Sequence, residues 1–284
     1  MADEDLFASH RDELRRASAP LPARMRPRTL DEVVGQRHLL APGAAFRSMV
    51  EAGRISSMIL WGPPGTGKTT LANLVAKEVD GTLERLSATS AGVKDVREVL
   101  ARAEQRLGED RGRTILFLDE IHRFNKAQQD ALLPGVEDGT VTLVGATTEN
   151  PFFEVNSPLI SRATVFRTEA LSADEVEELV RRAVADPMRG IGDVSVDDDA
   201  IAAIASRVGG DARLALNTIE TAATIVFGRG ASNVDVAAVE EALQRRVIRY
   251  DRAGDRHYDV ISAFIKSLRC LLYTSDAADE DCLV

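Results

Sequence analysis

Cysteine and long apolar runs are scarce in this chain of 284 residues. Both cysteines, Cys270 and Cys282, lie in the last 15 residues, so residues 1–269 can form neither a disulfide nor a thiolate metal site. No apolar run approaches the roughly 18 residues of a membrane-spanning helix. The start, Met1-Ala2-Asp3-Glu4-Asp5, is acidic where a signal peptide is basic. These absences exclude redox chemistry for residues 1–269 and predict a cytoplasmic location.

Positive charge is also in short supply. The chain carries 45 acidic and 35 basic side chains, for a formal net charge of −10. Domains that cover nucleic acid with their whole surface usually have a basic isoelectric point, so we expect any contact with DNA to be local. With 44% hydrophobic and 28% charged residues, the sequence is otherwise typical of a globular protein large enough for two modest domains.

The most informative segment that is present runs from Gly62 to Thr69 and fits the phosphate-loop (Walker A) pattern. In this pattern glycines let backbone N–H groups wrap the phosphates, a lysine supplies a positive charge and a hydroxyl binds Mg²⁺. We therefore expect Lys68 to pair with the β- and γ-phosphates of ATP and Thr69 to bind Mg²⁺. The residues predicted here to bind the nucleotide are Pro63, Pro64, Gly65, Thr66, Gly67, Lys68, Thr69 and Thr70.

A second motif supplies two acids. The apolar run of residues 115–118 ends in Asp119 and Glu120, a Walker B pattern. A buried strand of this kind delivers one carboxylate to the metal ion and the next to the attacking water. We expect Asp119 to hold Mg²⁺, directly or through water, and Glu120 to act as general base. An exposed acid at a helix start is the alternative interpretation of Glu120.

Between Leu30 and Thr168 strand and helix patterns alternate, which predicts a parallel sheet with helices on both faces. The phosphate loop joins the first strand to a helix, so its anion site would lie at a helix N-terminus. The expected strands are 58–61, 114–118 and 141–145, and the expected helices are 69–79 and 93–107.

After Thr168 helices replace strands. A capping box, Ser172-Ala173-Asp174-Glu175, opens an amphipathic helix to about Ala185, and further helices are expected at 197–208, 211–226 and 234–246. Ahead of both parts, Pro20, Pro22 and Pro27 predict an extended path. The predicted fold class is an α/β P-loop NTPase core with a parallel sheet, followed by an all-α helical lid.

The order of these elements resembles that of the AAA+ ATPases, which implies further site residues. Thr148, which follows the strand 141–145, matches the polar sensor that helps to orient the attacking water, with Thr147 as the next best match. Arg162 resembles the arginine finger that reaches the γ-phosphate bound by a neighbouring subunit, a contact worth about 10³ to 10⁵ in rate. A surface arginine at a helix end is the alternative.

Two more positions follow from the same resemblance. Arg213, after Gly210-Asp211-Ala212, matches the second sensor, which couples the lid to the phosphates; a solvated charge on the lid is the alternative. The segment Val33-Val34-Gly35-Gln36, with Val34 and Gly35 as the predicted binding residues, lies where the family encloses the adenine. One absence is informative as well. AAA+ unfoldases grip polypeptide with an aromatic residue between the two nucleotide motifs, and none occurs between Trp61 and Phe117. A protein-threading motor is therefore not expected.

A narrower resemblance is carried by the segments 25–27, 35–36, 38–40, 122–130, 136–139, 145–151, 257–259 and 262–267. With these segments the chain resembles the replication-associated recombination protein A (RarA or MgsA) family over about residues 20–269. The resemblance implies a DNA-dependent, Mg²⁺-requiring ATPase acting at stalled replication forks and single-stranded gaps, in replication, recombination and repair. It also implies single-stranded DNA binding protein as a partner, a homo-oligomer, and a cytoplasmic, nucleoid-associated location.

Two basic residues are the candidate DNA contacts. Arg123 and Lys126 follow the catalytic carboxylates, and their spacing of three predicts that they share one helical face. The alternative is that both side chains are solvated on the surface and do not contact DNA.

The C-terminal end departs from the family pattern after Arg269, and we expect a gene fragment whose last residues pack poorly and whose assembly is weak. The predicted division is a flexible N-terminal arm (1–19), the α/β domain (20–168), the helical lid (169–248), the start of a truncated oligomerisation domain (249–269) and a tail unrelated to the family (270–284).

Two other functions share part of this evidence. A clamp-loader or Holliday-junction branch-migration ATPase subunit would use the same nucleotide chemistry. An ATP-gated interaction module would bind the nucleotide with little turnover.

Overall fold

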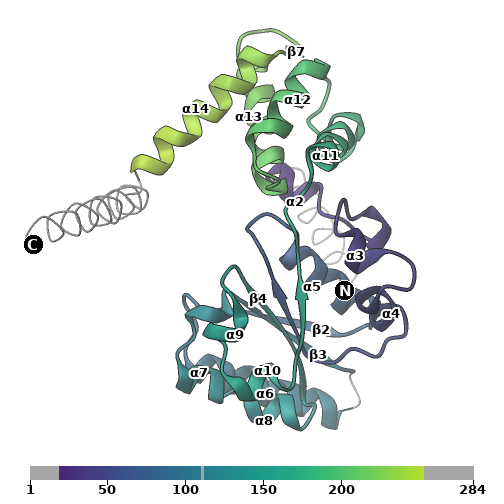
Figure 1. The fold of residues 1–284 in the computed structure, drawn as a ribbon, viewed down its shortest axis with the longest axis vertical. Helices are drawn as coiled ribbons and strands as arrows, with labels where there is room; N and C mark the ends of the chain where they lie inside the picture. Colours follow the sequence, from purple (N-terminus) through teal and green to yellow (C-terminus); the bar gives the residue numbers. More distant parts are fainter. Residues whose placement is uncertain (1–18, 110–111, 253–284) are drawn as a thin grey trace, which may run out of the picture.

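A computed structural model describes residues 19–109 and 112–252, with side chains placed as far as residue 244. An α/β unit and a helical lid lie end to end, and helix α14 extends away from the lid (Figure 1). The expectations for residues 1–18, for the segment after residue 252 and for the tail 270–284 lie outside the described residues. No helix in the two described stretches combines the length and apolar character needed to cross a membrane.

The α/β unit is built on five parallel strands in the order β2-β3-β4-β1-β5. The predicted parallel sheet is confirmed, and the two edge strands, β2 and β5, were missed. Both edges are only partly buried and carry charged residues such as Glu84 and Arg167, so they lack the apolar run that identifies a central strand. The strands are β1 (Met58–Trp61), β2 (Thr82–Ser87), β3 (Thr114–Asp119), β4 (Val141–Thr147) and β5 (Thr164–Arg167).

Alternate residues of the central strands face two separate cores. In β3, Ile115 and Phe117 pack with α4 and α5, whereas Leu116 and Leu118 pack on the opposite face with α6 and η2. The helices and 3₁₀ turns of this unit are η1 (Leu30–Glu32), α3 (Arg37–Leu40), α4 (Ala45–Glu51), α5 (Lys68–Glu78), α6 (Val93–Gly108), η2 (Ile121–Arg123), α7 (Lys126–Asp130), α8 (Leu133–Glu137), α9 (Pro151–Glu154) and α10 (Ser157–Ile160).

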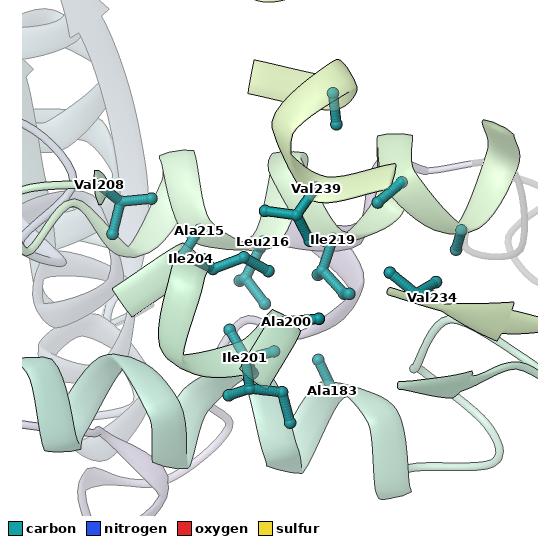
Figure 2. Close-up of a cluster of buried hydrophobic side chains, with 14 of the residues drawn as sticks. Ala183, Ala200, Ile201, Ile204, Val208, Ala215, Leu216, Ile219, Val234 and Val239 are labelled. Atoms are coloured by element: carbon teal, nitrogen blue, oxygen red, sulfur yellow. The ribbon is translucent and has the colours of Figure 1, made fainter. Parts of the chain in front are cut away.

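The lid has a core of its own, in which Ile201 and Ile204 pack against Leu216 and Ile219 (Figure 2). The predicted capping box is present, because Ser172 N–H donates to Glu175 and Glu175 N–H donates to Ser172 Oγ. The lid is not purely helical, since two strands of two residues each pair within it. Its elements are α11 (Ala173–Ala185), β6 (Ser195–Val196), α12 (Asp198–Arg207), α13 (Ala212–Gly228), β7 (Asn233–Val234) and α14 (Val236–Arg252).

Residues 20–28, which we call the N-terminal strap, join the two units. The expected extended path is wrong at its start, because Pro22 lies in the first turn of helix α2 (Leu21–Arg24), where its missing N–H costs nothing. Leu21 and Met25 are buried in the core of the lid, not in the α/β unit. The backbone N–H of Leu21 donates to Glu220 of α13 at 2.9 Å, while Lys77 of α5 donates to the carbonyl of Arg28 at 2.8 Å.

Candidate nucleotide site

The phosphate loop connects β1 to α5, as its motif predicts. Gly65 and Gly67 have φ values of 72° and 92°, a left-handed backbone that favours glycine, and α5 begins at Lys68. The loop therefore presents backbone N–H groups at a helix N-terminus, where anions are stabilised. Lys68 Nζ donates to the carbonyls of Gly62 and Pro63 at 2.7 Å each, which holds the ammonium group over the loop.

The charges around Lys68 belong to three parts of the fold. Burial lowers the pKa of Lys68, whereas the carboxylates of Glu120 and Asp119 act to raise it and Arg213 of the lid adds to the lowering. Both Walker carboxylates and a lid arginine thus act on the same ammonium group. The structure thus brings together the lysine of the phosphate loop, the two Walker B carboxylates and the lid arginine that were predicted to share one nucleotide site.

These residues line one cleft of about 470 Å³ between the α/β unit, the lid and the strap. Its polar lining contains the Walker residues together with Thr148 and Arg213, and its apolar lining comes from the strap, Val34 and the lid. The predicted site residues in the lining are Val34, Pro64, Gly65, Thr66, Gly67, Lys68, Thr69, Thr70, Asp119, Glu120, Thr148 and Arg213. The apolar side chains Met25, Leu171, Leu179 and Leu216 make a surface suited to a purine base.

Gln36 and Thr168 lie behind the phosphate loop; the sequence analysis missed Thr168 and placed Gln36 only in the segment expected around the adenine. The hydroxyls of Thr66 and Thr168 lie 2.8 Å apart, and Thr168 N–H donates to the carbonyl of Trp61 at 2.7 Å. Gln36 donates to the carbonyl of Glu169 at 2.6 Å and accepts from the Glu169 N–H at 3.0 Å. Gln36 also donates to the carbonyl of Thr66 at 3.4 Å, and both side chains are buried, so they fix the phosphate loop to the segment that leads into the lid. Only their burial and long-range contacts reveal this role.

Arg26 of the strap is a further missed residue. It lines the cleft, and burial lowers its pKa, as do the positive charges of Arg85 and Arg213. No carboxylate among the described residues forms an ion pair with Arg26. The sequence signal was Met25-Arg26-Pro27, which marked the family resemblance but gave Arg26 no role.

Three predicted residues do not line the cleft. Gly35 and Pro63 lie outside its lining, although the Pro63 carbonyl accepts hydrogen bonds from Lys68 and Thr66. Arg162 is exposed after α10, where it pairs with Glu137 at 2.6 Å and donates to the carbonyl of Pro158 at 2.9 Å. Arg162 is thus accessible from outside the subunit, and its role as an arginine finger stays a prediction.

Thr147 and Thr148 occupy different environments. Thr148 lines the cleft, whereas Thr147 is buried at the end of β4 and its hydroxyl faces His122. The cleft position therefore favours Thr148 over Thr147 as the sensor candidate.

The shared helical face expected for Arg123 and Lys126 is wrong. Arg123 ends η2 and Lys126 begins α7, and the chain is extended at Phe124 and Asn125 between them. Asn125 accepts from Gln128 N–H as the N-cap of α7, so a new helix has to begin there. Both basic side chains are nevertheless exposed.

The oxygen donors of the cleft fit Mg²⁺. This ion prefers one or two carboxylates together with substrate phosphates and water over an all-protein cage. Asp119 and Thr69 supply a carboxylate and a hydroxyl to the same cleft. No cluster of three or more His, Cys, Asp or Glu side chains suited to a metal occurs within residues 19–109 and 112–252.

The fold and the site together define a P-loop ATPase of the AAA class. Residues 58–170 match the family model described as the ATPase family associated with various cellular activities (AAA), and residues 190–269 match the AAA C-terminal domain. Among solved structures, the Holliday junction branch migration motor RuvB of Thermotoga maritima has a TM-score of 0.65 and 29% sequence identity. The match covers 78% of this chain and 72% of RuvB.

Curated relatives identify the family more narrowly. Replication-associated recombination protein A of Escherichia coli (strain K12) is 50% identical over 88% of this chain, and that of Bacillus subtilis (strain 168) is 41% identical over 88%. The chain belongs to the replication-associated recombination protein A family of AAA ATPases. It spans 57% and 59% of the length of these two relatives.

Proposed function

We propose that this protein is a DNA-stimulated, Mg²⁺-requiring ATPase that acts at stalled replication forks and single-stranded gaps in DNA. One observation carries the nucleotide part: residues from the ends of β1, β3 and β4 and from the lid line a single cleft around Lys68. The family membership and the likeness to a branch migration motor support the DNA part. Single-stranded DNA binding protein as a partner and a homo-oligomeric assembly are proposed on the family resemblance alone.

In the proposed reaction Lys68 and the phosphate-loop N–H groups hold the β- and γ-phosphates. Glu120 removes a proton from a water whose oxygen bonds to the γ-phosphorus, while the bond from that phosphorus to the β–γ bridging oxygen breaks, giving ADP and phosphate. Thr148 orients the water. When bound by Thr69 and Asp119, Mg²⁺ supplies positive charge for the phosphate oxygens.

Two arginines, one from the lid and one from a neighbouring subunit, complete the proposed site. Arg213 reaches the phosphates from the N-terminal end of α13, and Arg162 reaches the γ-phosphate bound by an adjacent subunit. Hydrolysis is then coupled both to the lid and to the assembly, as expected of a remodelling motor.

Arg123 and Lys126 are the proposed DNA contacts. They lie on the short elements that directly follow Asp119 and Glu120, so phosphate binding there would act on the segment that carries the general base. The acidic net charge supports a contact that is local.

Single-turnover ATP hydrolysis with and without single-stranded DNA tests the proposal. We expect stimulation by DNA, loss of nucleotide binding in Lys68→Ala, and binding with strongly slowed but measurable cleavage in Glu120→Gln. ATP binding without cleavage by the unmodified protein would favour an ATP-gated interaction module. Cleavage that is stimulated only by four-way junctions would favour a branch-migration subunit, in keeping with the likeness to RuvB.

A further inference from the structure

The side chain of Glu120 has one close partner in the structure. Glu120 has a left-handed backbone, with φ of 56°, and it precedes the single turn of η2. That turn brings His122 back to Glu120, so that Nε2 of the ring lies 3.3 Å from Oε2 of the carboxylate. No other hydrogen bond or ion pair of the Glu120 side chain occurs among the described residues.

His122 has a second partner on its other side. Its Nδ1 lies 3.0 Å from the hydroxyl of Thr147, which is only 1% exposed at the end of β4. The Thr147 hydroxyl in turn accepts from the N–H of Glu149 at 3.0 Å and lies 3.2 Å from the Glu149 carbonyl. The three side chains thus connect the segment after β3 to the end of β4.

The hydrogens on these atoms can be assigned by counting donors. A carboxylate only accepts, so the contact with Glu120 requires a hydrogen on His122 Nε2. In the neutral ring Nδ1 is then an acceptor, and the Thr147 hydroxyl donates its only hydrogen to it. The same hydroxyl still accepts from the Glu149 N–H. In this arrangement the Thr147 hydroxyl does not donate to the Glu149 carbonyl, which lies 3.2 Å away.

We propose that His122 is a positioning residue that fixes the carboxylate of Glu120, with Thr147 fixing the ring of His122. The inference rests on the proposed ATPase function and adds a residue to which neither nucleotide motif assigns a role. The contact from His122 is to Oε2, which leaves Oε1 of Glu120 to accept from the attacking water. Among the described residues His122 is the one side chain within ion-pair distance of the Glu120 carboxylate, so it is the candidate for fixing its orientation.

The expected effect is on the chemical step, since His122 does not line the nucleotide cleft. A displacement of a catalytic group by about 1 Å can lower the rate about 10²-fold. His122→Ala should therefore lower the single-turnover rate about 10- to 100-fold and leave the Kd for ATP within about twofold. His122→Gln, whose amide can donate to Glu120 and accept from Thr147, should recover most of the rate. Thr147→Val, which keeps the shape and removes the hydroxyl, should give an intermediate loss.

A cycle with Glu120→Gln separates positioning from a general loss of structure. If His122 acts through Glu120, His122→Ala has no further effect in a protein that already carries Glu120→Gln. Equal losses in both backgrounds, or a His122→Ala rate within about twofold of the unmodified protein, would overturn the proposal.

A second readout does not depend on catalysis. ¹⁵N spectra of histidine-labelled protein, with His122 assigned through His122→Gln, should show a hydrogen on Nε2 and none on Nδ1, and Thr147→Val should shift the Nδ1 resonance. A ring that carries its hydrogen on Nδ1 would overturn the proposal. Failure of the ATPase function is recognised separately, because the unmodified protein would then bind ATP without cleaving it while the ring keeps the expected tautomer.

Discussion

The backbone N–H of Ala212, the first residue of lid helix α13, donates to the carbonyl of Gly65 in the phosphate loop at 3.2 Å. The lid therefore touches the loop itself and not only a nucleotide between them. Asp211, which caps α13 by accepting from Leu214 N–H at 2.8 Å, packs so closely that a Cβ on Gly65 would lie 1.9 Å from its Oδ1.

A side chain at Gly65 should therefore displace the lid. We expect Gly65→Ala to lower the free energy of unfolding by clearly more than the roughly 1–2 kcal/mol of left-handed strain, and to weaken ATP binding. Gly230→Ala is the matched control, because its φ is 72° and nothing lies within 4 Å of the added Cβ. Urea unfolding and ATP titration measure both effects.

Asp211→Ala tests whether this clash is the cause. Alone it should cost about 1 kcal/mol for the lost helix cap, and combined with Gly65→Ala it should cost less than the sum of the two. Fully additive losses would contradict the contact.

Substitution of Arg26 should weaken nucleotide binding without destabilising the fold. Arg26 is partly buried beside Arg85 and Arg213, and burial and those two charges lower its pKa. Phosphates would neutralise this cluster, so we expect Arg26→Gln to raise the Kd for ATP about 10-fold, the equivalent of 1.4 kcal/mol. Without nucleotide the variant should unfold at an equal or higher temperature, because a repelled charge has been removed. A lower unfolding temperature with an unchanged Kd would show that Arg26 serves structure alone.

Glu84 should make stability depend on pH. Hydrogen bonds from Arg102, and after these from Arg106, lower the pKa of Glu84 and join edge strand β2 to α6. A carboxyl with a lowered pKa contributes stability above the pKa of the unfolded chain and loses it as pH falls through the folded value. Glu84→Gln should therefore reduce the free energy of unfolding by about 1–3 kcal/mol at neutral pH.

The difference between Glu84→Gln and the unmodified protein should disappear in acid, once Glu84 is protonated in both states. Urea unfolding over a pH series measures it. Glu98→Gln is the control on the same helix. Its exposed pair with Lys94 at 3.8 Å is worth about 0.5 kcal/mol. A Glu84→Gln difference that stays constant into acid would refute the assignment.

Arg162 should act on a neighbouring subunit. Its ion pair with Glu137 is exposed, and exposed pairs contribute about 0–1 kcal/mol, so little holds the guanidinium in place. In the assembled protein we expect Arg162→Ala to lower hydrolysis about 10³-fold or more with unchanged ATP binding. Mixing it with Lys68→Ala subunits, whose arginine is intact, should restore activity. Full activity of Arg162→Ala alone would exclude the finger.

The sequence predicted the elements whose signals are local. The central strands read as apolar runs, the capping box at Ser172 is four residues long, and the phosphate loop needs eight consecutive residues. Edge strand β2 escaped prediction because one side of it meets solvent, so charged residues interrupt its apolar pattern. Arg123 and Lys126 were predicted to share a helical face because they are three residues apart. Spacing alone does not reveal that a new helix begins after Asn125.

By itself, then, the sequence determined that a phosphate loop and two adjacent carboxylates, the candidates for binding the metal and for the general base, follow the ends of buried strands. Spacing along a strand or a turn is enough to fix such positions. Only the tertiary structure decided that Thr168 and Gln36 anchor the loop, that the strap belongs to the lid core, and that His122 lies between Glu120 and Thr147. Those contacts join residues that sheet order and domain packing bring together. The periodic patterns that predict helices and strands do not predict such contacts.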